Sequence, residues 1–67
     1  MKDKITGYLR LIGKDQKYLA SYLDISETTL SFKINGKTEF NRHEMISIVR
    51  LIKEKIPTVS MDEIFFE

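Results

Sequence analysis

Cysteine and tryptophan are absent from this 67-residue chain, which also contains only one proline and three glycines. Without cysteine, the chain can form neither a disulfide framework nor a zinc site with thiolate ligands, and a reducing cytoplasm is its expected setting. Apolar runs are at most three residues long, so we expect neither a signal peptide nor a membrane-spanning helix. Gly7, Gly13 and Gly36 are isolated, which excludes a glycine-rich phosphate-binding loop.

Groups that could carry catalysis are scarce. A domain of this size buries about 60% of the surface of its unfolded chain, which leaves little room for a catalytic cleft. His43 is the only histidine, and its neighbours fit the exposed first turn of a helix. Asp62 and Glu63 follow Ser60, where acidic residues favour the positive end of a helix dipole. We therefore expect a single domain over residues 1–67 that is not an enzyme and holds no metal ion, cofactor or small-molecule ligand.

Charge is unevenly divided along the chain, although the net charge is only +1. Residues 1–55 contain all eleven Lys and Arg together with seven acids, a net charge of +4. Residues 56–67 contain three acids and no base, a net charge of −3. A weakly basic body with an acidic tail is compatible with phosphate binding on one face, although many domains without this function share the asymmetry.

Hydrophobic periodicity predicts an all-α fold of five helices. Four apolar residues spaced i, i+3, i+4 and i+7 predict a first helix that ends at Gly13, namely Ile5, Tyr8, Leu9 and Ile12. The same spacing predicts a fourth helix that starts near Arg42, through Met45, Ile48, Val49 and Ile52. Asn41 and Glu44 are expected to form a capping box at its start. Ser60 is expected to cap a last short helix over residues 61–66.

The second predicted helix begins at Gln16 and is short. Asp15 can cap it, and Leu19, Ala20 and Leu23 form one apolar stripe along it. Asp24 then interrupts the stripe. Aspartate tolerates a left-handed backbone better than most residues other than glycine, so the chain can turn sharply at this point.

The third predicted helix follows this turn almost at once. Ser26 is a good N-cap, Leu30 and Ile34 make an inward i, i+4 pair, and Asn35-Gly36 ends the helix. Two helices of this length joined by so short a turn are typical of a helix-turn-helix, here over residues 16–34.

An ordered set of residues in this stretch resembles the DNA-binding domains of the phage Cro and repressor family, which includes regulators of the xenobiotic-response-element type. The family pattern runs glutamine, two variable residues, Leu-Ala, two variable residues, an apolar residue, usually glycine, an apolar residue and Ser or Thr. A recognition helix ending in Asn-Gly-Lys follows. The matching residues are Gln16, Leu19, Ala20, Leu23, Ile25, Ser26, Leu30, Asn35, Gly36 and Lys37. The resemblance implies a compact five-helix, lambda-repressor-like or Cro-like fold.

The resemblance also implies sequence-specific binding of double-stranded DNA by a transcriptional regulator, a repressor or switch protein of a phage or bacterial element. In the family, the recognition helix lies in the major groove. The base-reading residues expected on its outward arc are Glu27, Thr28, Ser31 and Phe32. The expected phosphate-binding residues are Gln16, Thr29, Lys33, Asn35, Gly36, Lys37 and Arg42.

Three departures from the family pattern stand out. Asp24 replaces the usual glycine of the turn, at a cost of about 1 kcal/mol if it is left-handed. Lys33 occupies a position that is commonly apolar, and in one alternative the recognition helix ends early there, which turns Phe32 into the core. Leu9 and Ile34 stand where many members have an arginine and a glutamate, so an apolar pair replaces an ion pair.

Two further alternatives concern partners. One short recognition helix reads few base pairs, so we expect a homodimer on an inverted-repeat operator, joined through Ile64, Phe65 and Phe66, unless all three residues cap the core. The second function considered is a helix-turn-helix scaffold for protein–protein contact, such as an antitoxin-like or antirepressor-like adaptor. Glu27 favours it, because an acid at the front of a reading helix repels phosphate.

Overall fold

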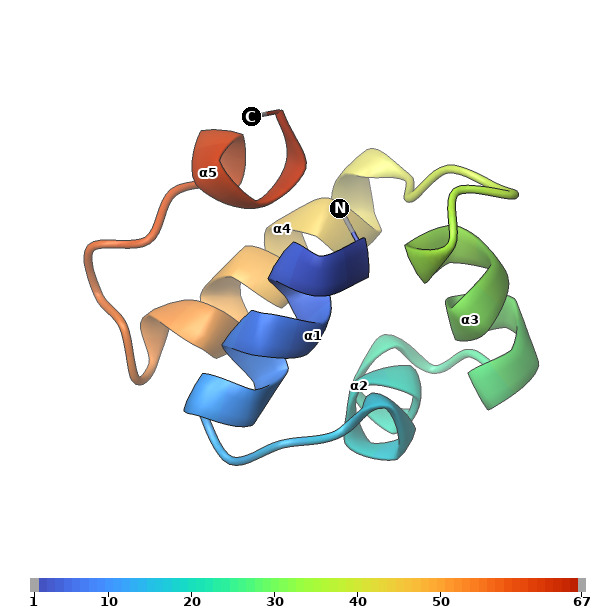
Figure 1. The fold of residues 1–67 in the computed structure, drawn as a ribbon, viewed down its shortest axis with the longest axis horizontal. Coiled ribbons are helices and arrows are strands. Elements are labelled where there is room, and N and C mark those ends of the chain that lie inside the picture. Colours follow the sequence, from blue (N-terminus) through green and yellow to red (C-terminus); the bar gives the residue numbers. More distant parts are fainter. Residues whose placement is uncertain (1, 67) are drawn as a thin grey trace.

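The computed structural model describes the backbone of residues 2–66 and the side chains of residues 4–66, and that part of the chain is entirely helical, without strands (Figure 1). The five helices are α1 (Lys2–Leu11), α2 (Gln16–Leu23), α3 (Glu27–Ile34), α4 (Arg42–Lys53) and α5 (Met61–Phe65). The prediction of an all-α chain with five helices is therefore confirmed. None of the described helices is both long and apolar enough to cross a membrane.

Four helices begin at the N-cap residues expected from the sequence. Asp15, Ser26, Asn41 and Ser60 each have extended backbone, and each side chain accepts a hydrogen bond from an amide three residues further on. At α4 the capping box is complete, because Glu44 also accepts from the amide of Asn41. A good N-cap contributes about 1 kcal/mol, which matters in a domain of this size.

The first three helices all end in the same way, with a left-handed residue directly after the last helical turn. That residue is Gly13 after α1, Asp24 after α2 and Gly36 after α3. At each of these ends, the backbone amide of the left-handed residue donates to the carbonyl three residues earlier. The amide of the following residue donates to the carbonyl five residues before it. These two hydrogen bonds define a Schellman motif. Asp24, with φ 59° and ψ 44°, thus adopts the left-handed turn that the sequence predicted.

The hydrophobic core draws on all five helices and on both long loops. The largest fully buried side chains are Ile5, Leu9, Leu19, Leu30, Ile48, Ile52 and Ile64. Phe40, in the loop before α4, meets Phe65 of α5 edge to face with 5.6 Å between ring centres. Burying one Leu, Ile or Phe side chain is worth roughly 1.5–3 kcal/mol, so these contacts supply most of the driving force for folding.

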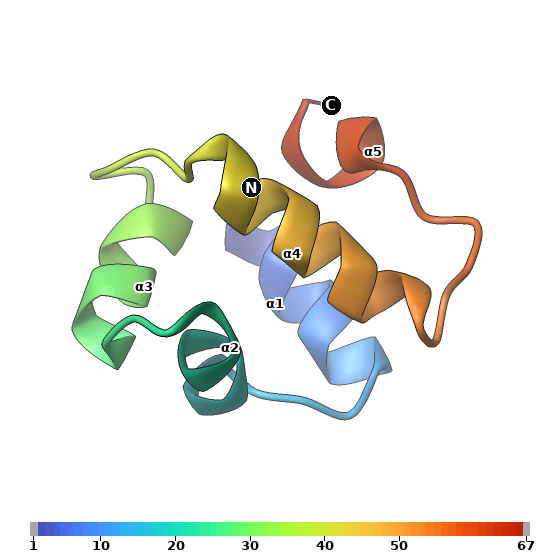
Figure 2. The same cartoon turned by 180° about the vertical axis from the view of Figure 1, so that it is seen from behind.

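The helices are arranged so that α3 lies at one end of the molecule. α2 packs against both α3 and α4, and α5 packs against α4. In Figures 1 and 2, α3 and the loop 54–60 lie at opposite ends, with α4 between them. The start of α4 is therefore the end that faces α3.

Two expectations about aromatic residues are settled by their burial. Phe32 is 45% exposed and α3 continues to Ile34, so the alternative in which Phe32 packs in the core is wrong. At the C-terminus, Ile64 and Phe65 are buried, whereas Phe66 is 65% exposed. The alternative in which all three C-terminal residues cap the core is therefore wrong too.

Candidate functional site

The four residues predicted to read bases lie on one side of α3, which we call its outer face. We define it by Glu27, Thr28, Ser31 and Phe32. Glu27, Thr28 and Phe32 are exposed, while Ser31 is half-buried. Their orientation follows from the helical period, because Leu30 and Ile34 on the opposite side are buried in the core.

The polar side chains at the two ends of α3 are used to cap it. Thr29 lies beside Ser26, whose hydroxyl donates to Thr29 Oγ1 at 2.9 Å. The Asn35 amide donates to the carbonyl and to the hydroxyl of Ser31, at 2.8 and 3.2 Å. Asn35 is therefore folded back along the last turn of α3, and Ser31 already has one hydrogen-bond partner.

The turn after α3 uses its backbone amides internally. The amides of Gly36 and Lys37 donate to the carbonyls of Lys33 and Phe32, at 3.2 and 2.9 Å, and the Asn35 amide donates to Ser31. These backbone amides are therefore not open to an external phosphate. Of the phosphate-binding groups predicted in this turn, the Lys37 ammonium is the one that stays a candidate. That ammonium lies 5.5 Å from the centre of the Phe32 ring.

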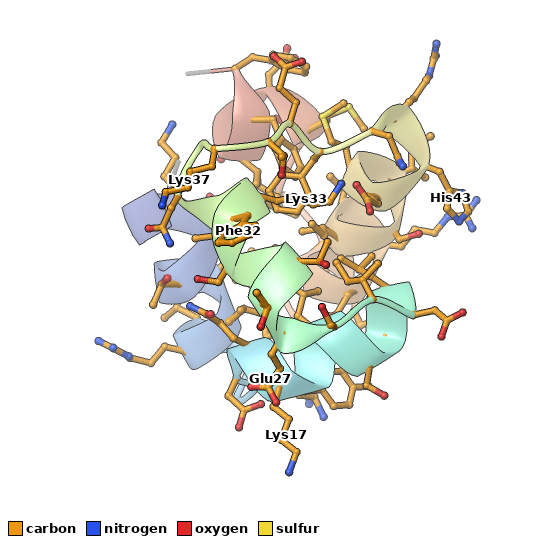
Figure 3. The ribbon with its side chains drawn as sticks, turned by 90° about the vertical axis from the view of Figure 1, so that its right-hand side faces the viewer. Lys17, Glu27, Phe32, Lys33, Lys37 and His43 are labelled. Atoms are coloured by element: carbon orange, nitrogen blue, oxygen red, sulfur yellow. The ribbon has the colours of Figure 1, made fainter. Side chains whose placement is uncertain are left out.

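Lys33 points away from the outer face of α3, toward α4 (Figure 3). Its ammonium donates to Glu44 Oε1 at 2.8 Å and to the carbonyl of Glu39 at 3.3 Å. The two side chains of this ion pair are only 14% and 9% exposed. Lys33 is therefore half of a largely buried ion pair, and its charge is committed within the protein.

The pKa of Glu44 reflects two opposing effects. Burial of the carboxylate alone would raise its pKa. The hydrogen bonds from Lys33 and from the Asn41 amide outweigh burial, together with the charges of Lys33 and His43, and the pKa is lowered from its ordinary value. Glu44 thus favours the charged form within the fold.

Two lysines bracket the outer face of α3. Figure 3 shows Lys37 beside one end of the helix, and shows Lys17 and Glu27 pointing outward together at the other end. Lys17 is exposed and is not among the residues predicted from the sequence. Its position, one residue after Gln16 in the first turn of α2, is the signal that could have indicated it.

The remaining predicted residues lie at helix starts. Gln16 is the first residue of α2 and is half-buried, and Arg42 is the exposed first residue of α4. His43 is exposed too, but Figure 3 shows it pointing away from α3. Among the described residues, no three acidic or histidine side chains gather closely enough to hold a metal ion.

Chemically, this arrangement is suited to binding. The outer face of α3 combines a carboxylate, two hydroxyls and an aromatic ring, with an ammonium at each end. Such a face can accept and donate hydrogen bonds, contact a methyl group and pair with an anion on either side. Comparisons of the chain with protein-family models, with curated proteins and with solved structures gave no match.

Proposed function

We propose that the protein is a sequence-specific, double-stranded-DNA-binding transcriptional regulator with a Cro-like helix-turn-helix fold, and that α3 is its recognition helix. The observation that carries the proposal is the outer face of α3, on which Glu27, Thr28 and Phe32 are exposed and which is bracketed by Lys17 and Lys37 (Figure 3). A repressor or switch protein of a phage or bacterial element is the role that the sequence resemblance implies.

The dimensions of α3 suit the major groove. An α-helix with its side chains is about 10–12 Å across, and the major groove is about 12 Å wide. Thr28 and Phe32 supply methyl and ring surface for a thymine methyl group. Glu27 can accept a hydrogen bond from the N4 amino group of cytosine.

Positioning on the backbone falls to the cations and polar groups around this face. Lys37 and Lys17 lie at the two ends of α3, where the groove edges carry phosphates. Gln16 and Arg42, at the starts of α2 and α4, are proposed as further phosphate contacts. Lys17 also offsets the repulsion between Glu27 and a nearby phosphate, because both side chains point outward at the same end of α3.

We further propose that the protein binds an inverted repeat as a homodimer. Phe66 is 65% exposed beside the buried Phe65, so it presents apolar surface that a second copy could cover. A dimer doubles the number of base pairs read, which one short helix needs for useful specificity.

Salt dependence tests the proposed function. Binding to a pool of random-sequence duplexes is measured by fluorescence anisotropy while the salt concentration is raised. Because binding releases counterions from the phosphates, log K should fall linearly and steeply with log salt. Binding that is absent at low salt, or that does not respond to salt, would contradict the proposal.

A protein–protein scaffold is the second candidate, and exposed Phe32 with Glu27 on the same helix favours it. An aromatic anchor in the centre of a helical face is typical of protein interfaces. In that case, association with the partner would depend on Phe32 and would change little with salt.

A further inference from the structure

The loop between α3 and α4 is anchored at one end and borders a surface pocket. The connection between α3 and α4 is the loop 35–41, which carries Lys37. A surface pocket of about 410 Å³ lies between this loop and the C-terminal end, bordered by Gly36, Thr38, Met45 and Phe66. Phe40 anchors the end of the loop nearest α4 against Phe65, while Gly36 and Thr38 border the open pocket.

Lys33 bridges α3, this loop and α4. From α3, its ammonium reaches Glu44 Oε1 on α4 at 2.8 Å and the Glu39 carbonyl in the loop at 3.3 Å. The same Glu44 oxygen accepts from the Asn41 amide at 2.9 Å. One carboxylate thus completes the N-terminal cap of α4 and holds α3 and the loop against it.

We infer that the Lys33–Glu44 ion pair is a positioning device of the DNA interface: it fixes α3 and the loop 35–41 relative to α4. The inference rests on the proposed function. Lys37 sits in this loop and Arg42 begins α4, so the pair also sets the spacing between two proposed phosphate contacts. Neither Lys33 nor Glu44 touches DNA in this account.

Two charge-removing variants separate positioning from direct contact. Lys33→Met keeps the length and apolar stem of the side chain but loses the charge. Glu44→Gln also removes a charge, yet glutamine serves at the third position of a capping box, so the cap of α4 is kept. Lys33→Arg retains the charge, and Lys55→Met removes a lysine just after the far end of α4 as a matched control.

Affinity is measured for a selected duplex and for random duplexes, with folding of each variant verified by circular dichroism. We expect Lys33→Met and Glu44→Gln each to weaken binding to the selected duplex about tenfold or more, the scale of one charge-assisted hydrogen bond. Binding to random duplexes should change less than about threefold, because the phosphate-contacting cations remain. Lys33→Arg should keep most of the affinity for the selected duplex, and Lys55→Met should change the affinity for neither the selected nor the random duplexes.

If Lys33 instead contacts phosphate directly, the two variants act in opposite directions. Lys33→Met would then weaken binding to both the selected and the random duplexes and lower the salt slope by about one. Glu44→Gln would strengthen binding to both, because it frees the Lys33 ammonium. That result would overturn the inference and leave the proposed function standing.

Amide hydrogen exchange of the free protein gives a readout that needs no DNA. Amides 36–40 should exchange faster in Lys33→Met and in Glu44→Gln than in the wild-type protein and in Lys55→Met. Unchanged exchange in both variants would overturn the inference whatever DNA binding shows. Failure of the wild-type protein to bind any duplex, with faster loop exchange in the variants, would refute the proposed function and with it the positioning role.

Discussion

The Lys37 ammonium lies 5.5 Å from the centre of the exposed Phe32 ring. Lys37 follows the left-handed Gly36, and the Lys37 backbone amide donates to the carbonyl of Phe32. The cation–π contact therefore holds a basic side chain at the edge of the outer face of α3. In the proposed complex, Phe32 reaches into the groove while Lys37 remains at the phosphates beside it.

Replacing Lys37 tests this division of roles. Lys37→Ala should weaken binding to selected and random duplexes by about the same factor and lower the salt slope by about one, because phosphate contacts do not read sequence. Lys55→Ala, at the far end of α4, should leave the slope unchanged. A change in sequence preference caused by Lys37→Ala would show that the docking orientation is wrong.

Leu9 and Ile34 belong to one buried cluster, with only 1% and 2% of each residue exposed. Either change to alanine should cost about 2–4 kcal/mol of unfolding free energy, because each leaves a cavity. Leu9→Arg and Ile34→Glu should each be worse than the double change, which can pair the two charges. Urea unfolding of the complete double-mutant cycle measures the coupling. Additive losses would mean that the two side chains do not touch.

Asp24 adopts a left-handed conformation with φ 59°. Asp24→Gly should raise the unfolding free energy by about 0.5 kcal/mol, because relief of a penalty of about 1 kcal/mol exceeds the added entropy of glycine in the unfolded chain. Gly36→Ala is the matched control: its new Cβ meets no atom within 4 Å, so the left-handed φ is the only new penalty, and the same balance against glycine entropy predicts a net loss of about 0.5 kcal/mol. Thermal or urea unfolding gives both values. Stabilisation by Asp24→Ala as large as by Asp24→Gly would refute the strain argument.

The ion pair at Glu44 predicts a pH dependence of stability. Because its pKa is lower in the folded than in the unfolded chain, Glu44 contributes stability that is fully present above the ordinary carboxyl pKa of about 4.3. That contribution is lost as the pH falls through the folded value. Urea unfolding from pH 7 to pH 3 should show the stability difference between wild type and Glu44→Gln shrinking below about pH 4.3. A difference that grows on acidification would contradict the sign.

Local signals in the sequence predicted the helices because caps and turns depend on neighbouring residues. Ser26 and Asn41 were recognisable as N-caps, and Asp24 as a left-handed residue, since each acts within a few positions of the chain. The same short range explains why the inward pair Leu30 and Ile34 could be predicted from spacing alone.

The Lys33–Glu44 pair was out of reach of such reasoning. From the sequence, Lys33 was interpreted as a departure from a commonly apolar position, and Glu44 as part of a capping box. The two residues are eleven positions apart, so no short-range pattern in the sequence indicates that they form an ion pair. Likewise, the engagement of the Gly36 and Lys37 amides within the turn depends on the backbone path, not on residue type. Lys17 differs from these features, because its position next to Gln16 could have indicated it, although its place beside Glu27 depends on the packing of α2 against α3.

Selection of bound duplexes from random DNA tests the central claim, that α3 reads base sequence, most directly. Wild-type protein should enrich one sequence, an inverted repeat with half-site centres about 10–10.5 base pairs apart. Thr28→Ala should change the preference at one base pair per half-site, whereas Thr58→Ala, the same change in the loop at the opposite end of the molecule, should not. Selection that enriches no sequence with the wild-type protein, or a preference that shifts with Thr58→Ala and not with Thr28→Ala, would contradict the claim.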